Sequence, residues 1–172
     1  MKRFGQEVGR VGFVASCWDL LHAGHCLFLK DAKRQCDYLI AGLQTDPTID
    51  RPEKNKPIMS LEERKTLLES IRYVDEVLMY ETEKDLNAAL ENLRPSVRVL
   101  GDDYVGKPFT GEGTEESVFY HMRSAHTWST TSLRKRIFDA EYQRQCRKSI
   151  KVANTVLPSN LQEKYSRPLP PM

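Results

Sequence analysis

Short apolar runs alternate with amphipathic segments along the chain, whose length is 172 residues. Short apolar runs of this kind are the pattern of buried strands in a parallel sheet. The expected strands lie at 11–17, 38–45, 76–80, 97–100 and 117–122. The expected helices between and after them lie at 24–35, from 60 to about 71, at 85–93 and at 129–151. Because strand and helix patterns alternate five times, the sequence predicts a doubly wound α/β fold with a five-stranded parallel sheet.

This fold is expected as a single domain over residues 11–140, preceded by an extension at 1–10 and followed by a helical extension and proline-rich tail at 141–172. The helix that starts after Ser60 shows a capping box, because Ser60 is followed by Glu63 three residues later. Its core side is expected to carry Leu61, Leu67, Leu68 and Ile71. Before it, residues 46–59 hold three prolines and many charges, and a loop of this length in a compact domain is typical of a functional lid or a disordered segment.

Composition narrows the class of protein. Apolar residues make up 40% of the chain, enough for a core, and 29% are charged. No apolar run reaches the roughly 18 residues that a membrane helix needs. The first ten residues are polar, so we expect no secretion signal. The cysteines (Cys17, Cys26, Cys36 and Cys146) show no C-x-x-C spacing, which favours reduced thiols and a cytoplasmic location.

The net charge of +2 is unevenly distributed. The stretch from Arg134 to Lys151 has seven basic and two acidic residues, so the rest of the chain is acidic overall. A solvated helix face and a helix near a phosphate site both explain this stretch, and a contact with RNA or a membrane surface is a weaker alternative. A nucleic-acid-binding protein is not expected, because such proteins are usually basic over a larger area.

The segment with the most distinctive chemistry is His22-Ala23-Gly24-His25, directly after the first strand and at the start of a helix. Residues three apart share a helical face, so both imidazoles can point at one ligand. The helix start adds free amides that favour phosphate, and Gly24 allows close approach of the backbone. Structural histidines are one alternative. A zinc site with Cys17 and Cys26 is another, although no second ligand pair follows.

The stretch from Trp18 to His25 resembles the signature of the cytidylyltransferase-like nucleotidyltransferases. Similar segments follow in the family's order at 71–77, 101–107 and 129–131, and the resemblance covers roughly residues 11–137. It implies a Rossmann-like fold of the HxGH type, CMP transfer from CTP to a phosphorylated alcohol such as glycerol 3-phosphate, Mg²⁺ held mainly by the nucleotide phosphates, and a homodimer.

The resemblance also implies roles for individual residues. His22 and His25 would hold the triphosphate and stabilise the transition state, with Lys54 or Lys56 neutralising phosphate charge. A second group would bind the nucleotide or the acceptor or shape their site: Asp19, Gly24, Arg64, Arg72, Asp102, Asp103, Ser129, Thr130 and Thr131. Structural alternatives remain for several of them: the loop lysines as solubilising residues, Arg64 paired with a glutamate of its own helix, and Ser129 as a helix cap.

One departure from the family pattern concerns residues 124–131. An arginine is missing from its expected place, where Arg123 or His126 would have to substitute, and Thr127 stands where the pattern has glycine. Two alternatives to the cytidylyltransferase therefore stay open: an adenylyltransferase of the same fold that acts on a sugar phosphate, and a non-catalytic nucleotide-binding module.

Overall fold

The structure is a computed structural model, and it describes residues 2, 3, 6, 7, 9–123 and 127–156. The chain divides into two compact units, Met1–Thr130 and Thr131–Met172. The first unit contains the sheet and the candidate site. The second contains most of helix α4 (Thr130–Val156), so the domain boundary expected at residue 140 falls inside this helix.

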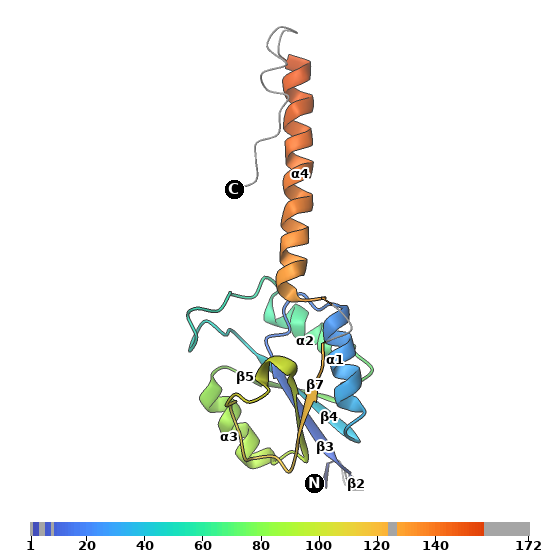
Figure 1. Cartoon of the computed structure of the whole chain (residues 1–172), viewed down its shortest axis with the longest axis vertical. Coiled ribbons are helices and arrows are strands. Elements are labelled where there is room, and N and C mark those ends of the chain that lie inside the picture. The colour runs from blue at the N-terminus through green and yellow to red at the C-terminus, as the bar shows by residue number, and fades with distance from the viewer. Residues whose placement is uncertain (1, 4–5, 8, 124–126, 157–172) are drawn as a thin grey trace. The chain divides into compact units, whose positions relative to one another are not determined.

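Five parallel strands form the sheet, in the order β5-β4-β3-β6-β7 (Figure 1). They are β3 (Val11–Ser16), β4 (Tyr38–Gln44), β5 (Glu76–Tyr80), β6 (Val97–Gly101) and β7 (Val118–His121). All five strands predicted from the apolar runs are confirmed, as is the parallel arrangement. The order reverses between β3 and β6, which makes this the switch point where ligands of open α/β sheets bind.

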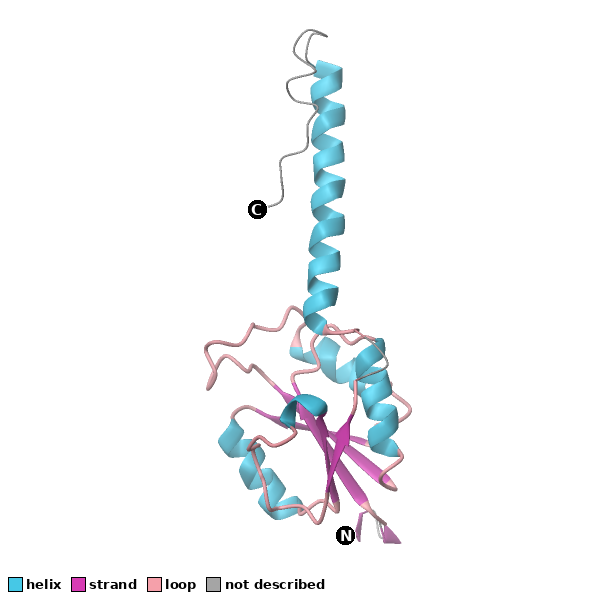
Figure 2. Cartoon of the chain, viewed as in Figure 1, coloured by secondary structure: helices cyan, strands magenta, loops and turns pink. Residues whose placement is uncertain are grey.

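Helices cover both faces of the sheet (Figure 2). On one face, α1 (Ala23–Lys33) and α2 (Leu61–Glu69) pack through Leu29, Ala32 and Leu68 onto a core that includes Val14 and Val99. On the other face, α3 (Glu83–Leu93) packs Leu86 and Leu90 onto Phe13 and Ile40. β3, β4 and β5 thus send alternate side chains to the two cores, which explains why both faces of these strands are largely apolar.

The predicted capping box of α2 is present, with Ser60 and Glu63 each satisfying an amide of the other. An analogous box of Thr82 and Asp85 starts α3, two residues earlier than expected. Leu67 was predicted to face the core and is instead 37% exposed. The buried residues of α2 are Arg64 and Leu68, which lie four residues apart on one face of the helix. Leu67 lies beside this face, toward solvent.

The connection between β6 and β7 contains no α-helix. It consists of a 3-10 turn, η1 (Asp102–Tyr104), and a loop at 105–117. Near the N-terminus, where only an extension was expected, two short strands, β1 (Lys2–Arg3) and β2 (Gln6–Glu7), form an antiparallel pair. Among the helices of the described residues, none combines the length and apolar character needed to cross a membrane.

Candidate active site

The turn after β3 has an unusual backbone. Trp18 and Leu20 have positive φ values of 54° and 48°, a conformation that costs free energy for residues other than glycine. The buried Trp18 indole offsets this cost by donating a hydrogen bond from Nε1 to the Gly42 carbonyl, at 2.8 Å. The turn therefore delivers the chain from the end of β3 to the start of α1 in a fixed geometry.

His22 is the N-cap of α1. Its Nδ1 atom accepts a hydrogen bond from the Gly24 amide at 3.1 Å, so the proton of the neutral ring lies on Nε2. His22 Nε2 is 3.4 Å from the Thr130 hydroxyl oxygen. The same hydroxyl donates a hydrogen bond to the Asp19 carbonyl oxygen, also at 3.4 Å. The hydrogen bond from the Gly24 amide of α1 thus orients the His22 ring, and its Nε2–H faces Thr130, the first residue of α4.

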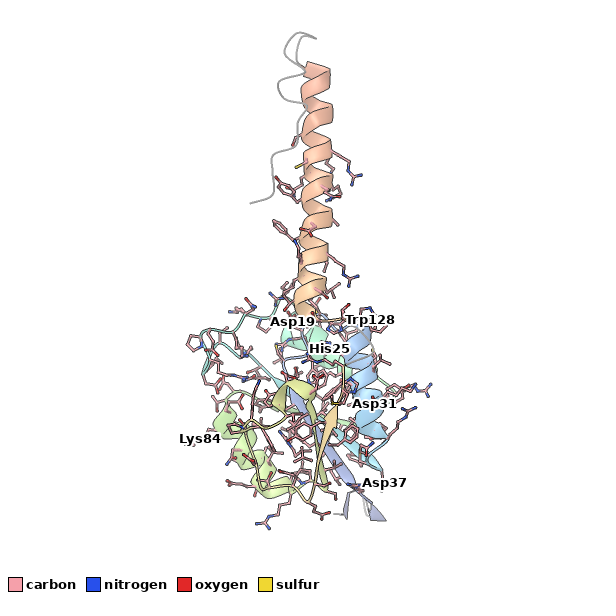
Figure 3. The ribbon with its side chains drawn as sticks, viewed as in Figure 1. Asp19, His25, Asp31, Asp37, Lys84 and Trp128 are labelled. Carbon is pink, nitrogen blue, oxygen red and sulfur yellow. The ribbon has the colours of Figure 1, made fainter. Side chains whose placement is uncertain are left out.

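The His25 ring stacks on His22, with ring centroids 3.9 Å apart, and meets the edge of Trp18. Burial, and secondarily the neighbouring His22, lowers the pKa of His25 to about 3, although Asp19 opposes this shift. His25 is therefore neutral at physiological pH. The expected convergence of both histidines at the mouth of one helix is present in the structure, and Figure 3 shows His25 near Asp19 and Trp128, at the opposite end of the unit from Asp37.

Gly24 has neighbours that leave no room for a side chain. A Cβ atom there would lie 2.9 Å from Cε1 of His22 and 3.0 Å from the Trp128 carbonyl oxygen. The glycine therefore lets the segment 127–130 approach the start of α1 closely. This places Ser129 and Thr130 beside the histidine pair, while Thr131 is the first residue of the second unit.

Asp19 is buried and holds the end of the long loop. Its Oδ1 atom accepts hydrogen bonds from the amides of Ile58 and Met59, at 3.1 and 3.0 Å. Since α2 begins at Leu61, this carboxylate joins the turn after β3 to the loop and the following helix. Among the roles that the resemblance implied for its group, this geometry matches shaping the site, since Asp19 positions the loop.

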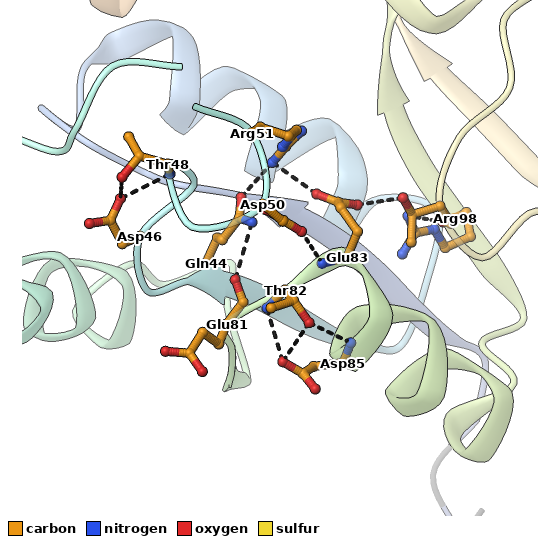
Figure 4. A network of polar contacts seen from close by, with 11 residues as sticks. Gln44, Asp46, Thr48, Asp50, Arg51, Glu81, Thr82, Glu83, Asp85 and Arg98 are labelled. Atoms are coloured by element: carbon orange, nitrogen blue, oxygen red, sulfur yellow. Dashed lines mark hydrogen bonds and ion pairs between the residues drawn. The ribbon is translucent and has the colours of Figure 1, made fainter. Parts of the chain in front are cut away.

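The lysines expected to act from the loop, Lys54 and Lys56, are both exposed. Lys56 Nζ is 3.7 Å from Asp46 Oδ2. The loop itself is tied down by Arg51, whose Nη2 donates to Gln44 Oε1 at 2.6 Å and pairs with Glu83 Oε1 at 2.8 Å (Figure 4). Arg51 and Glu83 were not predicted from the sequence, because their contact joins residues 32 positions apart.

Arg64 is buried under the carboxyl ends of two strands. Its guanidinium donates to the carbonyls of Cys17, Gln44 and Thr45, at distances of 2.6–2.9 Å. It therefore does not pair with a glutamate of its own helix. Its role in the structure is to hold the ends of β3 and β4 together and to add a fixed positive charge beneath the histidine turn.

Arg72 lies elsewhere. It is exposed in the turn before β5, stacked on its neighbour Tyr73 at 5.0 Å, and this turn is at the amino end of the strands. The nearby ion pair of Asp75 with Lys33, at the end of α1, marks the same edge. The histidine pair is at the carboxyl edge, so within this chain the structure does not bring Arg72 to the candidate site.

Asp102 and Asp103 follow β6 at the carboxyl edge, as expected. Both bind Arg123: its Nε is 2.7 Å from Asp102 Oδ1, and its Nη2 is 3.1 Å from Asp103 Oδ1. Hydrogen bonds from the amide and side chain of Arg123 lower the pKa of Asp102, and that carboxylate raises the pKa of Arg123. The three residues form one ionic cluster. His126, the other candidate to replace the missing arginine, lies outside the described residues.

Two further buried polar residues of the sheet were missed from the sequence. His121, at the end of β7, is buried and its Nδ1 is 2.9 Å from Asp31 of α1. Arg98, in β6, is buried on the α3 face. A charged residue inside an otherwise apolar strand was the signal that could have identified Arg98.

The zinc alternative finds no support in the part of the chain that the structure describes, where no three His, Cys, Asp or Glu side chains are grouped to hold a metal ion. The cysteines of the described residues are free thiols.

A parallel sheet with paired imidazoles at a helix start, beside the switch point of the strand order, is the arrangement expected of a nucleotidyltransferase. Comparison with known proteins agrees: the sequence profile of the cytidylyltransferase-like family matches residues 13–152, and the chain belongs to this family. It is therefore placed among the nucleotidyltransferases, a group of transferase enzymes.

Two sequence relatives illustrate the likeness. The chain is 34% identical over 133 residues to the bifunctional protein HldE of Campylobacter concisus, covering 77% of this chain and 28% of that protein. It is 38% identical over 109 residues to HldE of Geobacter sulfurreducens, covering 63% and 22%. The chain thus spans about a quarter of the length of these relatives.

Among solved structures, a lipopolysaccharide core biosynthesis protein from Thermoplasma volcanium superposes with a TM-score of 0.52 at 20% identity, covering 69% of this chain and 99% of that one. At this identity the likeness concerns the fold.

Proposed function

We propose that this chain transfers a nucleoside monophosphate from a nucleoside triphosphate, with CTP as the expected donor, to the phosphate of a small phosphorylated alcohol such as glycerol 3-phosphate. An acceptor phosphate oxygen attacks the α-phosphorus in line, the bond to the β-phosphate oxygen breaks, and pyrophosphate leaves with the electron pair. The observation that carries this proposal is the stacked pair His22 and His25 at the mouth of α1.

The histidines are suited to charge stabilisation. The N–H of His22 is oriented by its own helix, and the neutral His25 ring can also donate one hydrogen bond. Donors fixed before the reaction are worth most when charge develops at the α-phosphate. The α1 amides add donors around a triphosphate. The Thr130 hydroxyl, which donates to the Asp19 carbonyl in the free protein, would turn to the phosphate, with Ser129 and Thr131 adjacent in sequence.

The lysines of the loop would add positive charge. Lys54 and Lys56 are exposed on a segment anchored at one end by Asp19 and near the other by Arg51, so the segment between the anchors can close over phosphate. Mg²⁺ would be carried by the nucleotide phosphates and would neutralise the leaving pyrophosphate.

A second donor, ATP, is favoured by the departure at residues 124–131, since the arginine and glycine of the cytidylyltransferase pattern are missing there. The acceptor would then be a sugar phosphate. The same catalytic geometry serves either nucleotide, because it concerns the phosphate chain and not the base.

The test is pyrophosphate release from CTP and from ATP, each with Mg²⁺ and a panel of phosphorylated polyols, amino alcohols and sugars. His22→Ala and His25→Ala should each lower kcat by about a hundredfold or more while the circular dichroism spectrum is retained. Lys54→Gln with Lys56→Gln should lower turnover, whereas Lys84→Gln, an exposed lysine of α3, should not. Undiminished turnover in both histidine variants would refute the mechanism, and a strong preference for ATP would refute the cytidylyl assignment.

A further inference from the structure

Two connections leave the carboxyl edge of the sheet on either side of the histidine turn. The loop 46–59 follows β4, and the segment 105–117 follows β6 through η1, while β3, which leads to the turn, lies between these two strands. Both connections reach the start of α3, where a single carboxylate contacts them together. This carboxylate belongs to Glu83, the first residue of the helix.

Each oxygen of the Glu83 side chain holds a different connection. Oε1 pairs with Arg51 Nη2 of the loop 46–59 at 2.8 Å. Oε2 accepts a hydrogen bond from the Thr110 hydroxyl of the segment 105–117. The Glu83 amide also donates to Asp50 Oδ2 at 2.6 Å, so the loop binds the start of α3 through two neighbouring residues (Figure 4). The two connections therefore meet on one side chain.

Both partners of Glu83 are in turn attached to the sheet. Arg51 Nη2 donates to Oε1 of Gln44 at 2.6 Å, and Gln44 is the buried last residue of β4. The Thr110 carbonyl accepts a hydrogen bond from Nη2 of the buried Arg98 in β6, at 3.4 Å. A continuous path of polar contacts thus runs from β4 through Glu83 to β6.

The expected phosphate-binding residues lie one turn away from this path. The Lys54 amide donates to the Arg51 carbonyl at 2.9 Å, so Lys54 and Arg51 belong to the same turn of the loop. The Arg51 and Glu83 side chains are only 32% and 30% exposed. A polar contact that is partly shielded from water is stronger than one at the open surface, and the members of such a network support one another.

We propose that Glu83 is a positioning residue that couples the two connections, so that a movement of the loop 46–59 is transmitted to the segment 105–117. The inference rests on the proposed function for the identity of the ligand that moves the loop. When Lys54 closes over the nucleotide phosphates, the shift reaches Glu83 through Arg51 and the segment 105–117 through Thr110. Nucleotide binding then orders this segment before the acceptor arrives.

The first test measures the coupling in the free protein by hydrogen exchange. The Lys54 amide reports on the loop 46–59, and the Glu112 amide, bonded to the Phe109 carbonyl at 3.3 Å, reports on the segment 105–117. Thr110→Val removes the hydroxyl and keeps the shape of the side chain, and it should speed exchange at Lys54 about twofold or more. Arg51→Met should speed exchange at Glu112 to a similar extent.

Each variant has a matched control in its own connection. Thr114→Val removes a hydroxyl that bonds within the segment 105–117, and Thr48→Val removes one that bonds within the loop 46–59. We expect each control to leave exchange in the opposite connection unchanged. Thr110→Ser, which keeps the hydroxyl, should behave as the wild type. Faster exchange only within the mutated connection would overturn the proposal.

The second test distinguishes coupling from two separate anchors. If both contacts act through Glu83, the double variant Arg51→Met, Thr110→Val should speed exchange at each reporter by less than the product of the single effects, with a difference of about twofold or more. The reason is that the second change removes little once the bridge is broken. An effect equal to the product would show that the contacts are independent, and the inference would be wrong.

The third test adds nucleotide, as CTP or ATP with Mg²⁺ at saturating concentration. In the wild type, binding should slow exchange at Lys54 and at Glu112 by about fivefold or more, whereas in Thr110→Val only Lys54 should be protected. Protection confined to Lys54 in the wild type, or protection at Glu112 that survives in Thr110→Val, would overturn the proposal. If neither nucleotide protects Lys54 in the wild type, the proposed function fails, and exchange in the free protein still decides on Glu83.

Discussion

The dependence of the unfolding free energy on pH should report directly on the environment of His25. Its pKa falls from an ordinary value of 6.5 to about 3 in the folded protein, mainly through burial. As the pH drops below about 6.5, the unfolded chain takes up a proton at this residue and the folded chain does not. Protonation therefore favours the unfolded state, and the stability that neutral His25 allows at pH 7 is lost progressively down to about pH 3.

The magnitude follows from the size of the shift. Each pKa unit corresponds to about 1.4 kcal/mol, so lowering the pH from 7 to 5 should cost about 2 kcal/mol through His25 alone. The replacement His25→Asn removes this titration and keeps a polar side chain. We expect the variant to lose about 2 kcal/mol less than the wild type over the same interval.

Urea denaturation at both pH values measures this difference, because the carboxylates that also titrate are common to the two proteins. Equal losses of unfolding free energy in wild type and variant would show that His25 is protonated as easily in the folded state as in the unfolded chain. In that case the ring would be accessible to solvent, and the description of a dry, neutral imidazole beneath His22 would be refuted.

Three further outcomes follow from contacts around the site. Asp19→Ala should lower the unfolding free energy by about 2 kcal/mol, because two amides lose a charged acceptor. It should also speed proteolysis at residues 46–59, and unchanged cleavage would mean that the loop is anchored elsewhere. Gly24→Ala should lower both the melting temperature and turnover, because the added methyl group meets His22 and a main-chain carbonyl; wild-type turnover would show that this contact can relax. Glu83→Gln should speed cleavage of the same loop without unfolding the sheet. Arg51→Lys should have a smaller effect, because it keeps the positive charge. Equal cleavage in both variants would exclude the ion pair as the anchor.

The sequence predicted the framework well because buried parallel strands must be apolar on both faces, and this leaves an unmistakable pattern. It also predicted the histidine pair, whose geometry is decided by a local turn and a helix start. The pairing of Arg123 with Asp102 could not be foreseen in this way, since it joins residues 21 positions apart through the arrangement of η1 and β7. Arg72 shows the opposite case: it precedes the predicted strand at 76–80, and in a parallel sheet this places its turn at the amino edge, away from the histidine pair. The resemblance had favoured a role at the nucleotide site over this local signal.

The exposed Leu67 illustrates another limit. Four apolar residues of the predicted helix suggested a broad apolar face, yet α2 buries Arg64 while Leu67 is exposed. An arginine can be buried there because three strand-end carbonyls converge on it, and this convergence exists only once β3, β4 and α2 are assembled.

The absence of a helix between β6 and β7 has a consequence for how such an enzyme changes its choice of substrate. A crossover helix contributes to the core, so altering it destabilises the domain. A surface segment such as 105–117 can exchange residues, lengthen or shorten at little thermodynamic cost. Transplanting this segment between relatives should therefore leave the sheet folded, so that any change in the acceptor used can be assigned to the segment itself.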